Sequence, residues 1–171
     1  AFQALDAASA DHHGELVAMD RSIGTLRAKL RQLGIAENTL LVFNSDNGGL
    51  PGIQPETTGG LRGNKGTVYE GGLRVPGILE WPAVIRPRIT SHPACVVDLF
   101  PTIADVVGLP QEVFVRPLDG VSLRPLLTAE TGPRAQPLGF RYGLKAAFID
   151  NQVKLLTHDH TKDDYELYDL G

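Results

Sequence analysis

The sequence predicts an α/β protein with parallel strands, followed by a small C-terminal antiparallel α+β subdomain. Three patterns indicate this class: an amphipathic helix near the start, a continuous run of apolar residues soon after it, and a hairpin pattern near the end. Helices that alternate with buried strands favour a parallel sheet, whereas short strands joined by a tight turn favour an antiparallel one. We place the α/β domain at residues 1–112 and the subdomain, with its antiparallel hairpin, at residues 113–171.

The first predicted element is a helix that ends before Gly34, where a helix C-terminus favours glycine. Its apolar residues recur at alternating spacings of three and four, which places them on one face. Charged residues fall mostly on the other side of the helix. The apolar face consists of Leu16, Met19, Ile23, Leu26, Leu30 and Leu33.

The apolar run at residues 40–43 predicts a strand that is buried on both faces in a parallel sheet, because it does not alternate and closely follows a helix. In open α/β sheets, ligands bind just beyond the carboxyl ends of the strands. Asp46 and Asn47 would lie there and offer a carboxylate and an amide oxygen, which Ca²⁺ and Mg²⁺ prefer. The alternative is an ordinary hydrogen-bonded turn, because Asp, Asn and Gly favour turns.

A glycine-rich loop follows this strand and carries one lysine, Lys65, between Gly63 and Gly66. Glycines let the backbone approach a bound anion closely, so a cation in this loop indicates an oxyanion site. The alternative is a solvated loop lysine.

The remaining elements are predicted from shorter patterns. Residues 75–81 predict a second strand, residues 98–107 a helix with Asp98 as its N-cap, and residues 123–127 a short helix. Apolar segments at 146–149 and 153–156 flank Asp150-Asn151-Gln152, which predicts a hairpin.

Composition excludes several classes of partner and fold. The net charge of −4 shows no excess of basic residues of the kind that binds nucleic acid, so we expect no nucleic-acid partner. The single cysteine, Cys95, excludes an internal disulfide framework. No apolar run approaches the roughly 20 residues that span a bilayer. The chain begins Ala-Phe-Gln without a secretory signal, and we interpret it as a piece of a longer protein whose compartment its sequence does not reveal.

Two segments resemble the second half of a sulfatase: LVFNSDNG at residues 41–48 and GNKGTVYEGGLRVP at residues 63–76. Further matches follow in the order of that family, at residues 18–20, 81–82, 98–102, 118–123 and 166–170. The resemblance implies an alkaline-phosphatase-like sandwich fold and hydrolysis of sulfate esters at a Ca²⁺ or Mg²⁺ site. It also implies a formylglycine nucleophile, made from a cysteine or serine in a Cys/Ser-x-Pro-x-Arg motif. This chain lacks that motif, and Cys95 has neither the proline nor the arginine, so the nucleophile lies outside the chain.

The resemblance also assigns roles to individual residues. Asp46 and Asn47 match two of the family's metal ligands, and Lys65 matches its sulfate-contacting lysine. Asp46 would also lie close to the nucleophile and help to deprotonate the attacking hydroxyl, so Lys65 and Asp46 are the candidate catalytic residues. The family's other metal ligands fall upstream of residue 1. We therefore expect the isolated chain to bind Ca²⁺ poorly, to be inactive and to self-associate through its uncovered surfaces.

The substrate class implied by the resemblance is a small-molecule or glycan sulfate ester, in a parent protein that is periplasmic or secreted. Two alternatives remain open at this point. One is a phosphonate monoester hydrolase or phosphodiesterase of the same superfamily, which uses a similar metal site. The other is a degenerate, non-catalytic sulfatase-like binding module.

Overall fold

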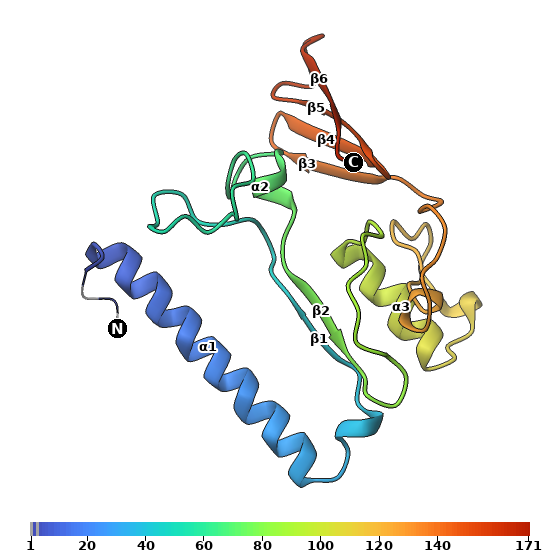
Figure 1. Cartoon of the computed structure of the whole chain (residues 1–171). Coiled ribbons are helices and arrows are strands. Elements are labelled where there is room, and N and C mark those ends of the chain that lie inside the picture. The colour runs from blue at the N-terminus through green and yellow to red at the C-terminus, as the bar shows by residue number, and fades with distance from the viewer. Residues whose placement is uncertain (1, 3) are drawn as a thin grey trace. The chain divides into compact units, whose positions relative to one another are not determined.

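The computed structural model describes residue 2 and residues 4–171, with the side chain of residue 111 left out (Figure 1). Its helices are α1 (Ala7–Gln32), α2 (Glu70–Leu73) and α3 (Leu99–Val106). Its strands are β1 (Leu41–Asn44), β2 (Gly77–Glu80), β3 (Leu138–Tyr142), β4 (Lys145–Asp150), β5 (Val153–Thr157) and β6 (Tyr165–Asp169). Within these described residues, no helix combines the length and the hydropathy needed to cross a membrane.

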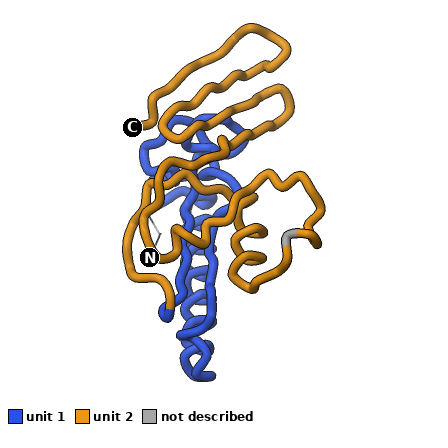
Figure 2. The backbone as a smooth tube through the Cα atoms, turned by 90° about the vertical axis from the view of Figure 1, so that its right-hand side faces the viewer, with its two compact units in different colours: residues 1–83 blue, residues 84–171 orange. Residues whose placement is uncertain are grey.

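The chain forms two compact units, residues 1–83 and residues 84–171, which Figure 2 shows in different colours. The domain boundary between residues 112 and 113 that the sequence suggests stays a prediction.

Helix α1 confirms the helix predicted from the spacing of its apolar residues. It begins after Asp6, whose carboxylate accepts the backbone N–H of Ser9 at 3.0 Å, and this bond satisfies one of the free donors at the helix start. Ser9 is fully buried, and its hydroxyl accepts the N–H of Gln54 at 2.9 Å. This bond fixes the first turn of the helix to the long loop between β1 and α2, residues 45–69. Much of the apolar face is exposed, with 47% of Leu26 and 58% of Leu33 accessible to solvent.

Strands β1 and β2 form a two-stranded sheet in the first unit, and they pair antiparallel with Leu41 opposite Glu80 and Asn44 opposite Gly77. The expectation of a parallel, doubly buried strand at residues 40–43 is therefore wrong for the described strands, since the apolar residues of β1 are only half-buried. An unalternated apolar run indicates apolar surroundings, but it carries no information about the direction of the neighbouring strand. Arg27 joins α1 to β2 through two hydrogen bonds to the Glu80 carboxylate, at 2.7 and 2.8 Å.

The second unit contains a four-stranded antiparallel sheet in the order β3-β4-β5-β6. The predicted hairpin is confirmed by β4 and β5, which pair with Asp150 opposite Val153. Asn151, at φ 53°, occupies the left-handed conformation that the turn requires. One face of the sheet is buried through Leu138, Ala147 and Leu156, and the other exposes Phe148, Leu155 and Leu167.

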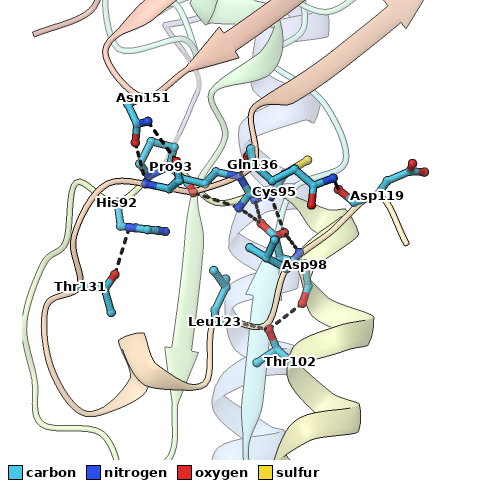
Figure 3. A network of polar contacts seen from close by, with 12 residues as sticks. His92, Pro93, Cys95, Asp98, Thr102, Asp119, Leu123, Thr131, Gln136 and Asn151 are labelled. Carbon is cyan, nitrogen blue, oxygen red and sulfur yellow. Dashed lines mark hydrogen bonds and ion pairs between the residues drawn. The ribbon is translucent and has the colours of Figure 1, made fainter. Parts of the chain in front are cut away.

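A buried ion pair between Asp98 and Arg134 ties the loops of the second unit together (Figure 3). The two side chains are 0% and 1% exposed, and the Arg134 guanidinium donates to both Asp98 oxygens at 2.8 Å. The same oxygens accept the N–H groups of Cys95 and Val121, each at 2.8 Å. Asp98 holds the predicted N-cap position of α3, although its side chain caps no N–H of that helix. Its carboxylate bonds instead to the nearby N–H of Cys95 and to the distant residues Val121 and Arg134.

Candidate functional site

The candidate site lies in the first unit, on two loops. The first loop, residues 45–49, follows β1 and carries Asp46, which is exposed, and Asn47, which is half-buried. The hydroxyl of Ser45 donates to the carbonyl of Asn47 at 2.9 Å, and the N–H of Ser45 donates to the carbonyl of Pro76 at 3.3 Å. The predicted position of Asp46 and Asn47 just beyond the carboxyl end of a strand is confirmed.

The second loop, residues 61–69, carries Lys65 and lies against the first loop. The backbone N–H of Lys65 donates to the carbonyl of Gly49 at 2.9 Å, and the N–H of Gly48 donates to the carbonyl of Gly72 at 3.0 Å. These two bonds join the loop after β1 to Lys65 itself and to Gly72 of α2. The structure therefore brings together the loops of the predicted metal ligands and of the predicted anion-binding lysine.

Glycines make this contact between loops possible. A Cβ atom on Gly48 would lie 1.8 Å from the carbonyl oxygen of Gly71, and one on Gly71 would lie 2.1 Å from the carbonyl oxygen of Gly63. Gly63 and Gly66 also have φ values of 82° and 87°, in the region that favours glycine. The sequence indicated glycines near a bound anion, but it gave no sign that three of them would pack backbone against backbone.

The turn that carries Lys65 is closed by Thr67, a residue that the sequence patterns did not single out. The Thr67 hydroxyl donates to the carbonyl of Asn64 at 2.8 Å and accepts the N–H of Asn64 at 3.1 Å. On either side of this turn, the guanidinium of Arg62 lies 4.0 Å from the centre of the Tyr69 ring, a favourable cation–π distance.

Glu56 is the other acidic residue on the long loop, and its carboxylate is already engaged by the chain itself. It accepts the N–H groups of Thr58 and Gly60, each at 2.7 Å, and the hydroxyl of Thr58. The hydroxyl of Thr58, followed by these backbone donors, lowers the pKa of Glu56 below its ordinary value. We therefore do not count Glu56 among the candidate metal ligands.

The donors present fit a hard cation, but they are only part of a complete set. Asp46 and Asn47 provide one carboxylate and one amide oxygen, which suit Ca²⁺ or Mg²⁺ better than a metal that prefers imidazole or thiolate. Among the described residues, no group of three or more His, Cys, Asp or Glu side chains converges on a common point. A calcium ion takes about six to eight oxygen ligands.

Comparison with known proteins identifies the family. A family model described as Sulfatase matches residues 9–109, more than half of the 171 residues. The chain belongs to the sulfatase family. The resemblance seen in the sequence motifs is thereby confirmed. This sulfatase chain is 40% identical to human Arylsulfatase A over 129 residues, which are 73% of the chain and 25% of that protein. It therefore spans about a quarter of the length of that relative.

Solved structures show the same fold. Ps i-CgsB in complex with k-i-k-neocarrahexaose superposes with a TM-score of 0.80 at 30% identity, over 95% of this sulfatase chain and 37% of that chain. A protein solved in complex with its substrate D-glucosamine-2-N,6-O-disulfate superposes with a TM-score of 0.68 at 25% identity, over 91% of this chain and 32% of the other. These likenesses confirm the predicted α/β class and its alkaline-phosphatase-like fold.

Proposed function

We propose that the complete polypeptide to which this chain belongs hydrolyses sulfate esters, and that residues 1–171 form one wall of its active site. The observation that carries this proposal is the junction of the two loops, where Lys65 and Gly48 donate to Gly49 and Gly72. Because the chain is a member of the sulfatase family, a bonded junction between the loop of Lys65 and the loop of Asp46 and Asn47 supports a shared role for these three residues.

Lys65 is proposed to hold the sulfate group. A sulfuryl group in transfer carries negative charge on its peripheral oxygens, and a fixed ammonium stabilises that charge best where water is excluded. The backbone bond from Lys65 to Gly49 at 2.9 Å fixes the point from which the side chain extends. Lys65 would therefore serve both substrate binding and catalysis.

Asp46 and Asn47 are proposed to hold a Ca²⁺ or Mg²⁺ ion together with ligands outside residues 1–171. Such an ion supplies positive charge next to the sulfate group when it is bound. The carboxylate of Asp46 is also proposed to accept the proton of the attacking hydroxyl. The nucleophile, a formylglycine by family resemblance, would lie outside this chain, so we propose that the isolated chain is inactive.

The proposed substrate is a sulfate ester of a glycan or of a small molecule. Support for a glycan comes from the solved structure that binds D-glucosamine-2-N,6-O-disulfate as its substrate, because this chain matches it over 91% of its own length. Support for a small-molecule ester comes from the 40% identity to human Arylsulfatase A.

The test is hydrolysis of 4-nitrophenyl sulfate by the complete enzyme and by its Lys65→Ala variant. Loss of one stabilising charge in the transition state should lower kcat/KM by about 10²–10³-fold. Lys29→Ala is the matched control, because Lys29 is an exposed lysine of α1 whose ammonium donates to the exposed side chain of Gln32. Unchanged turnover in Lys65→Ala would overturn the assigned role, and hydrolysis by the pure isolated chain would overturn its proposed inactivity.

Calcium binding gives an independent test. The isolated chain supplies two of about six to eight ligand oxygens, so calorimetry should detect no tight one-to-one binding of Ca²⁺. In the complete enzyme, Asp46→Ala should weaken Ca²⁺ binding. Tight stoichiometric binding to residues 1–171 alone would contradict the proposed division of the site.

A further inference from the structure

The turn that carries Lys65 has a single side chain that bonds to both polar groups of its first residue. The hydroxyl of Thr67 accepts the N–H of Asn64 at 3.1 Å and donates to the carbonyl of Asn64 at 2.8 Å. The backbone N–H of Thr67 donates to the same carbonyl at 3.0 Å. Lys65 thus lies inside a short turn whose two ends are joined three times.

The Thr67 hydroxyl is itself enclosed by backbone. A Cβ atom on Gly63 would lie 2.4 Å from the Thr67 hydroxyl oxygen, and one on Gly72 would lie 2.2 Å from the Thr67 carbonyl oxygen. Thr67 is half-buried in this enclosure. This packing, together with the two bonds to Asn64, restricts the Thr67 hydroxyl and stabilises the turn.

A lysine needs this kind of support more than most residues with a catalytic role. Its ammonium is a point charge on a flexible four-carbon stem, so the placement of its backbone largely decides which positions the charge can reach. A displacement of about 1 Å in a catalytic group can cost on the order of 10²-fold in rate. The bond from the Lys65 N–H to Gly49 anchors one side of the turn, and the Thr67 hydroxyl closes the other.

We propose that Thr67 is a positioning residue, whose hydroxyl sets the place of Lys65 and thereby the rate of sulfate-ester hydrolysis. This inference rests on the proposed function of Lys65 as the residue that holds the sulfate. Thr67 contacts no substrate in this scheme, and its effect passes entirely through Lys65.

The experiment uses the complete enzyme with 4-nitrophenyl sulfate and three variants of Thr67. Thr67→Val keeps the shape of the side chain and removes the hydroxyl, and it should lower kcat/KM by at least about tenfold. Thr67→Ala makes the same test with a smaller side chain, in case the valine variant does not fold. Thr67→Ser retains the hydroxyl and should stay within about threefold of the parent. Thermal unfolding checks that each variant is folded.

A double-mutant cycle with Lys65→Ala decides whether Thr67 acts through the lysine. Once Lys65 is absent, Thr67→Val should cause no further loss of kcat/KM. An equal loss with and without Lys65, or a Thr67→Ser variant as slow as Thr67→Val, would overturn the positioning role. An active Lys65→Ala variant would instead overturn the proposed function of Lys65, and the positioning role with it.

Discussion

Replacing Asp98 by asparagine should strongly destabilise residues 84–171, because it removes a buried charge while keeping the shape of the side chain. In the structure each oxygen of the Asp98 carboxylate accepts two hydrogen bonds, one from Arg134 and one from a backbone N–H (Figure 3). An asparagine has only one acceptor oxygen, so its NH₂ group would face two donors. The guanidinium of Arg134, 1% exposed, would lose its counter-charge.

The size of the effect follows from this geometry. Breaking a buried ion pair by removing one partner costs about 3–5 kcal/mol, because the remaining charge stays buried without compensation. A backbone N–H left without an acceptor contributes about 1–3 kcal/mol to such a loss. A small domain has a free energy of unfolding of only about 5–15 kcal/mol. Asp98→Asn should therefore lower the ratio of folded to unfolded protein by at least about 10²-fold.

Hydrogen exchange followed by mass spectrometry measures this effect locally. Peptides that cover residues 95–107 and 118–138 should exchange faster in the variant, because these segments contain the donors to Asp98. Asp105→Asn, in the adjacent helix α3, is the matched control. Asp105 pairs with Arg124 at 2.9 Å, but the two side chains are 40% and 59% exposed, and solvent screens such pairs strongly.

The reasoning would be refuted by an Asp98→Asn variant whose exchange and urea midpoint match those of Asp105→Asn. Such a result would mean that the buried pair contributes no more than a solvent-exposed one. Arg134→Gln removes the other charge of the same pair and should destabilise the protein to a similar extent. A large effect in Asp98→Asn alone would show that the backbone bonds of Asp98, not the charge pair, dominate.

Three further predictions concern the first unit. Gly48→Ala should destabilise the protein by about 1–3 kcal/mol or more, because its Cβ would lie 1.8 Å from the Gly71 oxygen. Gly14→Ala, in open space on α1, should instead stabilise the protein by about 0.5–1 kcal/mol. Equal urea midpoints for the two variants would contradict this. Hydrogen bonds from Arg27 hold the pKa of Glu80 below its ordinary value, so the pair stabilises the fold above the ordinary carboxyl pKa and loses this effect as the pH falls through the lowered pKa. The unsubstituted protein should therefore lose more stability on acidification than the Glu80→Gln variant. Parallel acid-unfolding curves for the two proteins would argue against this. The exposed apolar face of α1 should cause the isolated chain to self-associate in light scattering, and a monodisperse monomer would rule that out.

Local features were the ones that the sequence predicted well. The apolar helix face from Leu16 to Leu33 follows from residue spacing alone, although α1 itself begins earlier, at Ala7. The hairpin around Asn151 follows from two apolar segments flanking a polar turn. Each pattern depends on residues a few positions apart, and the backbone geometry of helices and hairpins relates such residues directly. The position of Asp46 and Asn47 at a strand end belongs to the same class.

The features that the sequence did not reveal share one physical cause. The N-cap position of Asp98 is local, but the main partner of its carboxylate, Arg134, lies 36 residues away in the sequence. The residue pattern at 40–43 indicates an apolar strand, but it does not indicate that the partner strand β2 runs antiparallel to it. Thr67 resembles any loop threonine until its two bonds to Asn64 are seen.

By itself, the sequence determined the long helix, the terminal hairpin and the sulfatase family, because short-range spacing and ordered motifs encode them. Only the tertiary structure decided that the loops of Asp46 and Lys65 meet, with Gly48 packed against Gly71 and the Lys65 N–H bonded to Gly49. Contacts between distant segments depend on which backbones can approach each other closely. The sequence pattern around one residue does not show which distant backbone will lie against it.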